Sequence, residues 1–444
     1  NIKADLHYQK PDMNIKELSC LVPEGRLSGS GTVALDKSSR TDIKITTSTG
    51  DISKTLRLVP SPPKGISGSA EAVISVKGKI DDPNISGSFK TGDFRFQSLF
   101  QAENIDGNFS FRDNRLVLDI NSPVALLGRL LANKLNAVVE WQPGRLDIME
   151  GSAKLLGGAF SSSGHVLLSQ KPELDLSGNF ENLALEKLPW KIPVDIEGKT
   201  YGEFSVSGTA DEPVIAFGIH SPNLITEGTT LDNLIIQGDF KKKILDLKAI
   251  FAQIGKADIE GNATIDLEKG FETDFKLAGT KLDIPFLLRN MEGNLKNIIT
   301  GKINLDINGQ YRPGLILARG IISSEVLAFN ELKIKDLYCP VVINGTSIEI
   351  PGMNASFYSG DLKSMAIMDL DDMSWESNLS VTSMDLGKTA EDQEDIPVTL
   401  SGKGDMKLKV RGRGSDLFSI FGTGDLLVTD GDIGGLSAIE AAAS

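Results

Sequence analysis

Apolar and polar residues alternate along most of the chain with a period of two. Residues 70–76 place Ala70, Ala72, Ile74 and Val76 on one side, with mostly polar residues between them, and residues 116–120, 303–307 and 406–410 repeat the pattern. This period is typical of a β-strand with one dry and one wet face, as in antiparallel sheets. Pairs such as Asp113-Asn114 separate the stretches and predict tight turns. The pattern therefore predicts an all-β fold of many short strands.

Helical periodicity is scarce by comparison. Short helices are expected near Leu282 to Asn290, from Asp416 to Phe421, and from Leu436 onward. No apolar run reaches the ~18 residues that a membrane-spanning helix needs. The sequence has no Met start and no signal peptide, and we interpret it as a piece of a longer chain.

Two glycine-rich blocks recur along the sequence. The first block occupies 25–35, 158–168, 255–265 and, more faintly, 360–370, and the second occupies 68–78, 202–208, 301–309 and 404–412. Recurrence at this spacing indicates a repeat protein, in which each unit touches mainly its neighbours. The sequence therefore predicts one continuous repeat-built β domain over 1–444, with approximate units 1–96, 97–225, 226–327 and 328–444.

A sheet of this kind has an apolar face that few helices are available to cover. Such a sheet can fold on itself into a sandwich or solenoid with a closed core. It can instead curl into an open trough whose apolar floor is covered by something else, since large exposed apolar surfaces mark binding sites. Composition alone favours the closed core, and both arrangements stay open at this point.

Charge and reactive residues narrow the function. The net charge is −14, from 46 basic and 60 acidic residues, which argues against nucleic-acid binding. Cys20 and Cys339 form no CxxC pair, and three histidines are too few and too scattered for a metal site. The serines at 161–163 beside His165 lack the turn that a nucleophile needs. We therefore expect no metal, no cofactor and no enzymatic activity, and we expect the two cysteines to be free buried thiols.

Three segments together indicate a family. Residues 78–87 read Gly-Lys-Ile-Asp-Asp-Pro-Asn-Ile-Ser-Gly, residues 158–168 form a Gly-rich strand pair, and residues 410–436 place Gly-Thr-Gly and Asp-Gly before a closing segment. With these features the chain resembles the AsmA-like superfamily of bacterial envelope proteins, a group of bridge-like lipid-transfer proteins. The resemblance covers the whole chain in style and residues 400–440 as a more specific C-terminal signature.

The resemblance implies a fold and a function. It implies an elongated, curled, taco-like antiparallel β-sheet built from about four repeats, with a hydrophobic groove that binds phospholipid acyl chains. It implies transport of phospholipid between membranes in the periplasm, in support of outer-membrane integrity. It also implies attachment of the full-length chain to the inner membrane through a segment missing from this piece, and an outer-membrane or periplasmic protein as a further partner.

The repeats and the resemblance together favour the open groove over the closed core. A groove of uniform apolar character suits acyl chains, because each buried CH₂ contributes ~0.8 kcal/mol. A slip of one residue in a strand would move its apolar set to the other face. The candidate groove residues are Ile74, Val76, Leu118, Ile120, Phe204, Val206, Leu245, Leu247, Ile303, Leu305, Leu408 and Val410.

Two other functions remain open on the sequence alone. The chain could be an assembly module for outer-membrane proteins that pairs its sheet edges with their strands. It could also be a carbohydrate-binding or adhesin-like solenoid with a closed core, which would need an aromatic platform. Aromatic residues make up only 6% of the chain, so few such platforms are available.

Overall fold

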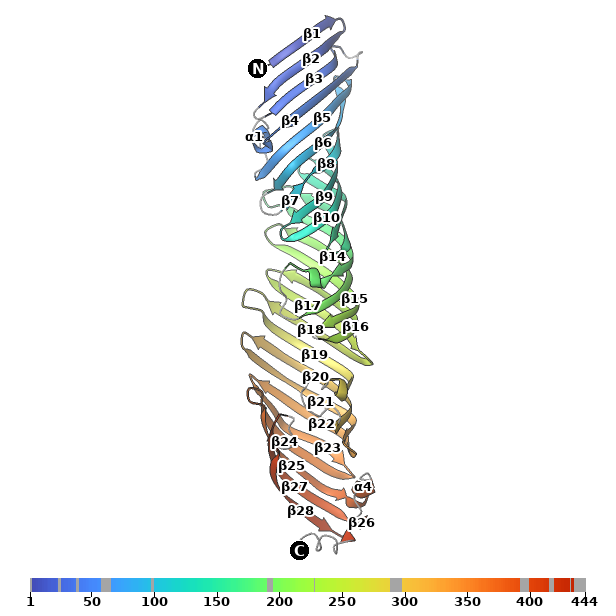
Figure 1. Cartoon of the computed structure of the whole chain (residues 1–444), viewed down its shortest axis with the longest axis vertical. Coiled ribbons are helices and arrows are strands. Elements are labelled where there is room, and N and C mark those ends of the chain that lie inside the picture. The colour runs from blue at the N-terminus through green and yellow to red at the C-terminus, as the bar shows by residue number, and fades with distance from the viewer. Residues whose placement is uncertain are drawn as a thin grey trace. The chain divides into compact units, whose positions relative to one another are not determined.

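A computed structural model gives the structure of the chain (Figure 1). It describes residues 2–22, 25–36, 40–56, 65–96, 100–189, 195–226, 228–287, 298–391, 399–414, 419–431 and 433–434. The chain divides into two compact units, Asn1–Gly228 and Thr229–Ser444. This division lies close to the predicted boundary between 97–225 and 226–327, and the finer division into four units stays a prediction.

Unit 1 consists almost entirely of antiparallel strands, with two short helical segments, α1 (Ile52–Leu56) and the 3-10 turn η1 (Leu185–Lys187). Its strands are β1 (Ile2–Gln9), β2 (Asp12–Val22), β3 (Gly25–Ala34), β4 (Thr41–Thr49), β5 (Ile66–Lys79), β6 (Asp82–Phe96), β7 (Phe100–Glu103), β8 (Ile105–Arg112), β9 (Arg115–Leu127), β10 (Leu130–Gln142), β11 (Arg145–Leu155), β12 (Gly158–Leu167), β13 (Glu173–Ala184), β14 (Ile196–Thr209) and β15 (Pro213–Thr226).

From β2 to β14, each strand of unit 1 pairs with the strands before and after it in the chain, with one exception (Figure 1). β7 and β8 both lie between β6 and β9, end to end in a single strand position. Asn104 separates them with a φ of 54°, a left-handed conformation that asparagine tolerates better than most residues. The unit is therefore a chain of hairpins.

Unit 2 has the same construction. Its strands are β16 (Thr229–Lys241), β17 (Ile244–Ile254), β18 (Ala257–Asp266), β19 (Glu272–Asp283), β20 (Ile299–Arg312), β21 (Leu315–Phe329), β22 (Leu332–Asn344), β23 (Ser347–Phe357), β24 (Gly360–Asp369), β25 (Ser374–Asp385), β26 (Thr399–Leu400), β27 (Lys403–Arg413), β28 (Phe421–Thr429) and β29 (Ile433–Gly434). β25 pairs directly with β27, while β26 and β29 form a separate two-stranded sheet. In this unit, the helices whose bounds lie within the described residues are α2 (Ile284–Leu287) and α4 (Leu386–Glu391).

The structure confirms the all-β, antiparallel fold with few short helices that the alternation predicts. The turn expected at Asp113-Asn114 joins β8 to β9, and both residues have positive φ angles of 52° and 61°, as in the type I′ turns of two-residue hairpins. The helix predicted from Leu282 is present only as α2 within the described residues.

The other two helix predictions are not confirmed. Of the helix predicted over 416–421, Phe421 instead begins β28, and residues 416–418 lie outside the described residues. The helix predicted from Leu436 also lies outside them. The periodicity did not predict α1 and α4, because segments of five and six residues are shorter than the window of about 11 residues in which a helical pattern can be recognised.

Fully buried side chains form small local clusters in each unit. In unit 1 one cluster joins Ala102, Ile105, Ala125, Ala132, Ala153 and Leu155. In unit 2 one cluster joins Phe357, Leu362, Val381, Met384 and Leu386, the last of which belongs to α4. Alanine supplies four of the six residues in the first cluster, so the backbones approach closely there. The clusters account for little of the apolar surface that the strands carry.

Candidate functional site

A row of apolar residues crosses fourteen strands of unit 1. Residues that face each other in an antiparallel ladder project to the same side of the sheet, so the register identifies the members of a row. From β1 to β15, omitting β7, the row is Ala4, Leu18, Gly29, Ile45, Ile74, Gly87, Phe109, Leu118, Val139, Ile148, Gly164, Leu176, Val206 and Ile215. No polar side chain interrupts it. We call the side to which this row projects the apolar face of unit 1.

Unit 2 has a corresponding row across eleven strands. From β16 to β25 and then β27, the row is Gly238, Leu247, Ala263, Phe275, Gly309, Ala318, Ile343, Ile348, Met368, Trp375 and Gly412. Again every member is apolar. This row defines the apolar face of unit 2, and the opposite side in each unit is its polar face.

The apolar faces are neither sealed nor fully exposed. In the row of unit 1, Ala4 on the edge strand is exposed and the other thirteen residues are half-buried. In the row of unit 2, nine residues are half-buried and only Gly238 and Ala318 are buried. A second layer of side chains would bring such residues close to complete burial, as in a closed core. The apolar side chains here cover one another in part and leave surface accessible along the rows.

All twelve candidate groove residues lie on these apolar faces. Ile74, Leu118 and Val206 are members of the unit 1 row, and Val76, Ile120 and Phe204 stand two residues away in the same strands. In unit 2, Leu247 is in the row. Leu245, Ile303, Leu305, Leu408 and Val410 alternate in step with it on their own strands. Every one of the twelve is half-buried. Six lie on the apolar face of each unit, on three strands that are separated by others in the sheet, and their role in binding stays a prediction.

Aromatic rings lie over glycines at two places on the apolar face of unit 1. Between β6 and β8, Gly87 faces Phe109 and Phe89 faces Gly107. A Cβ atom added to Gly87 would come within 2.8 Å of the Phe109 ring, and one added to Gly107 within 2.9 Å of the Phe89 ring. Each ring therefore lies against the sheet in the space that a side chain on the opposite strand would otherwise fill.

The same crossed arrangement recurs between β13 and β14. Gly178 faces Phe204, and Phe180 faces Gly202. Added Cβ atoms would come within 2.6 Å of the Phe204 ring and 2.5 Å of the Phe180 ring. Phe160 stacks on Phe204 with centroids 5.2 Å apart and an interplanar angle of 15°. We call these two arrangements the crossed Phe–Gly sites.

Sequence reasoning did not find the crossed Phe–Gly sites, although a signal was present. Gly-x-Phe occurs seven times in the sequence, and four of the occurrences, at 87–89, 107–109, 178–180 and 202–204, form the two sites. The spacing places glycine and phenylalanine on the same face of a strand. What it does not give is the partner strand, whose register decides that each ring meets a glycine.

In unit 2 the side chains that cover glycines are mostly aliphatic. Gly424 lies beside Leu408 and Gly422 beside Val410, two of the candidate groove residues. The indole of Trp375 lies over Gly412, at 2.6 Å from an added Cβ, and its Nε1 donates a hydrogen bond to the carbonyl of Gly414 at 3.1 Å. Phe275 likewise lies over Gly309, at 2.9 Å from an added Cβ, so Phe275 and Trp375 are aromatic exceptions at two points of the row.

The polar faces carry the charge and the ion pairs. Arg145 pairs with Asp147, and its hydrogen bonds hold the pKa of the Asp147 carboxyl below its ordinary value. Arg115 lies 3.8 Å from Glu140, and Arg312 lies 3.2 Å from Glu272. Solvent-exposed pairs of this kind contribute little to stability. They keep charged groups on one side of each strand, which fixes the side that the apolar residues take.

The cysteines are free thiols, as expected, but the expected burial is confirmed only for Cys339. Cys20 is half-buried, whereas Cys339 is buried with Leu337 and Val341 in a cluster of unit 2. Burial raises the pKa of the Cys339 thiol. Over the described ranges, no group of three or more His, Cys, Asp or Glu side chains is placed to hold a metal ion.

Comparison with known proteins adds no further identification. No known protein-family model matches the chain, and no curated protein sequence is similar to it. Within the part of the chain that the structure describes, none of the helices has the length and apolar character to cross a bilayer.

Proposed function

We propose that this chain binds phospholipid acyl chains along its apolar faces and conducts phospholipid between membranes in a bacterial periplasm. The activity is non-enzymatic and supports the integrity of the outer membrane. The observation that carries the proposal is the row from Ala4 to Ile215, which stays apolar over fourteen strands and half-buried beyond the first. A surface of this extent without a polar interruption suits a hydrocarbon ligand better than a sugar or a peptide.

The chemistry of the rows supports sliding. Each CH₂ group that leaves water contributes ~0.8 kcal/mol wherever along the row it lies. Because successive strands present similar apolar side chains, a hydrocarbon tail meets nearly equal contact energies from one strand to the next. The crossed Phe–Gly sites remove protrusions, since each ring lies over a glycine. A flat apolar surface holds a tail without trapping it at one position.

Site-specific photo-crosslinking tests the proposal. A photoreactive amino acid replaces Leu118 in unit 1 or Leu305 in unit 2, both half-buried on the apolar faces, and the full chain is incubated with phospholipid vesicles. Matched controls carry the same group at Asp119 or Asp306, the next residues along, which are exposed on the polar faces. The proposal predicts lipid adducts at 118 and 305 and few at 119 and 306. Equal labelling of all four positions, or none, would contradict it.

A specific observation also favours the assembly function. β1 pairs on one side only, with β2, within the described residues. All eight of its residues are exposed, and Ile2 is exposed to 73%. An edge strand of this kind can accept another strand through main-chain hydrogen bonds. Protein adducts at Leu118 and Leu305 without lipid adducts would support strand pairing with an outer-membrane protein instead of lipid transport.

A further inference from the structure

The polar face of β27 has an unusual charge for this protein. The residues of β27 that alternate with the apolar Met406, Leu408 and Val410 include Lys407, Lys409 and Arg411. Lys403 and Arg413 extend the series at the two ends, and Asp405 is its one acidic member. Five basic residues on one face of one strand stand out in a chain with a net charge of −14.

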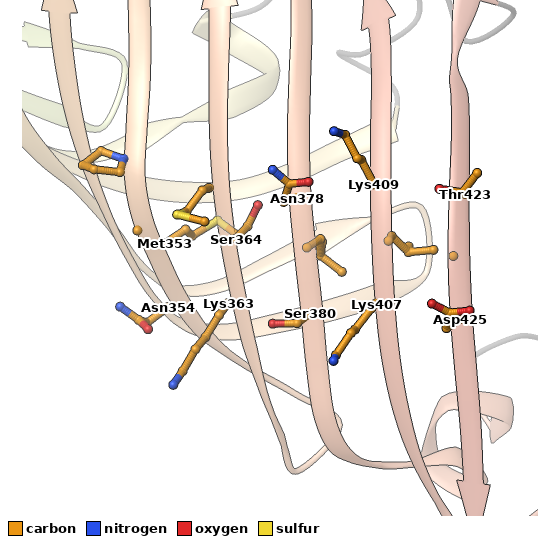
Figure 2. A pocket seen from close by; sticks show the side chains of 16 residues that line it. Met353, Asn354, Lys363, Ser364, Asn378, Ser380, Lys407, Lys409, Thr423 and Asp425 are labelled. Atoms are coloured by element: carbon orange, nitrogen blue, oxygen red, sulfur yellow. The ribbon is translucent and has the colours of Figure 1, made fainter.

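A hollow of about 650 Å³ lies on the same face, across β23, β24, β25, β27 and β28 (Figure 2). Two polar rows line it: Lys363, Ser380 and Lys407 face one another in one row, and Asn378 faces Lys409 in the other. Both rows project away from the apolar face. The row between them also contributes to the lining, through Leu379 and the candidate groove residue Leu408. Lys363 and Lys407 point toward one end of it, and Lys409 points toward the other (Figure 2).

The amines around the hollow are only partly compensated, and Asp425 faces Lys407 across the β27–β28 ladder. Lys409 lies 3.0 Å from Glu376. Among the described residues, Lys363 and Lys407 make no ion pair, and Asp425 is the one carboxylate in the lining. Because the amines diverge, they cannot all reach a single small anion. They match an extended surface that carries several negative charges.

Exposed apolar side chains stand among these basic residues. Phe421 faces Arg411 across the β27–β28 ladder and is exposed to 65%, and Leu427 on the same face of β28 is exposed to 60%. Met365 and Ile367 on β24 are also exposed on this side. Basic residues mixed with exposed aromatic and aliphatic side chains are typical of surfaces that lie in the headgroup region of a membrane. An acidic protein partner would not need the apolar members.

We propose that the polar face of β24, β25, β27 and β28 docks onto a bilayer that contains anionic phospholipid. The headgroup phosphates lie against Lys363, Lys407 and Lys409, and Phe421 and Leu427 enter the headgroup layer. The chain as a whole is acidic, so the docking is local to this face. The choice of a bilayer as partner rests on the proposed lipid function, which requires a place where lipid enters or leaves the apolar face.

Vesicle co-sedimentation of the full chain tests the docking. The vesicles contain phosphatidylcholine alone or with 30% phosphatidylglycerol. Binding is expected only to the anionic vesicles and is expected to weaken as salt rises. The variant Lys363→Gln/Lys407→Gln/Lys409→Gln is expected to lose about fivefold in affinity for each lysine, on the order of 100-fold together. Replacement of Phe421 and Leu427 by serine is expected to weaken binding at high salt as well.

A matched control variant distinguishes the effect of where the lysines lie from the effect of the net charge. Lys90, Lys154 and Lys276 are exposed lysines on other strands with no ion pair among the described residues. The variant Lys90→Gln/Lys154→Gln/Lys276→Gln changes the net charge equally and is expected to bind the vesicles like the parent chain. Equal losses in the two triple variants would overturn the proposal, as would equal binding to neutral vesicles.

A second assay distinguishes docking onto a bilayer from acyl-chain binding on the apolar faces. A monomeric fluorescent fatty acid, added without vesicles, reports the apolar faces alone. The Lys363→Gln/Lys407→Gln/Lys409→Gln variant is expected to bind it normally. Normal fatty-acid binding with no preference for anionic vesicles overturns the docking alone, whereas vesicle binding without fatty-acid binding overturns the acyl-chain proposal.

Discussion

The apolar faces of the two units are built with the same backbone device and different side chains. Between β13 and β14 in unit 1, Phe204 lies over Gly178; between β27 and β28 in unit 2, Leu408 lies over Gly424. A Cβ added to Gly178 would collide with the carbonyl oxygen of Ser161 as well as with the ring, whereas the nearest obstacle at Gly424 is a methyl of Leu408. Gly178 is thus enclosed by rigid contacts, whereas the nearest contact at Gly424 is an adjustable one.

A long apolar surface can stay flat if its large side chains lie over glycines. A large side chain would protrude from the sheet unless the opposite residue left room for it. Glycine leaves that room, and a rigid aromatic ring fills it with little conformational freedom to lose, because it has only two side-chain torsions. An aliphatic side chain fills the same room less completely.

Alanine at the two glycines should affect the units unequally. Gly178→Ala is expected to destabilise unit 1 by about 3 kcal/mol, at the upper end of overpacking costs, because a backbone carbonyl cannot move aside. Gly424→Ala is expected to cost about 1 kcal/mol, because Leu408 can change rotamer. Hydrogen–deuterium exchange resolved by peptide reports each unit separately. Equal effects would remove the distinction between rigid and adjustable contacts.

Alanine substitutions of the side chains that lie over the glycines test the same comparison. Phe204→Ala should destabilise unit 1 by about 2 kcal/mol and Leu408→Ala should destabilise unit 2 by about 1 kcal/mol. Both values lie below those for fully buried residues, since both side chains are half-buried. Urea denaturation followed by exchange in each unit measures them. A larger loss for Leu408→Ala would show that aliphatic contacts dominate.

A charge on either apolar face should weaken acyl-chain binding in both units. Leu118→Lys and Leu305→Lys are each expected to lower the affinity for a fluorescent fatty acid about tenfold, roughly 1.4 kcal/mol, because the tail must pass an ammonium group. Asp119→Lys and Asp306→Lys, which add the same charge to the polar faces, should leave the affinity nearly unchanged. If only one unit responds in this titration, the other does not take part in binding.

The two cysteines, one in each unit, should react with a maleimide at different rates. Cys339 in unit 2 is buried and its thiol pKa is raised, so less thiolate is present at a given pH. We expect Cys339 to react with a maleimide more slowly than the half-buried Cys20 at pH 8, and the difference to vanish in urea. Mass spectrometry of the labelled peptides separates the two sites. Faster labelling of Cys339 would indicate that its cluster opens.

Much of this surface could be predicted from the sequence, for a physical reason. The alternation of apolar and polar residues places Ile74 and Val76 on one side of β5 regardless of which strands are its neighbours. The pairing of β5 with β4 agrees with this placement. The partner of each residue depends on register, which no local pattern encodes. Gly87 and Phe109 lie 22 positions apart in the sequence, and only the pairing of β6 with β8 shows that the ring covers the glycine.

The hollow at Lys363 and Lys407 illustrates the same limit. The basic residues of β27 are visible in the sequence as Lys407, Lys409 and Arg411, but Lys363 belongs to β24. The two strands come close because β25 pairs with both. Residues 392–398 separate α4 from the next strand in sequence, and β26 is passed over in the ladder, so chain order alone does not give this neighbourhood.

Lipid analysis of the purified chain tests whether its apolar faces hold phospholipid acyl chains. Organic extracts of the parent chain, of a Leu118→Lys/Leu305→Lys variant and of an Asp119→Lys/Asp306→Lys control are compared by mass spectrometry at equal protein amounts. We predict phospholipid in the extracts of the parent and of the control, and a marked loss from the variant with charges on the apolar faces. Extracts free of phospholipid, or equal amounts from all three proteins, would contradict the claim that these faces hold acyl chains.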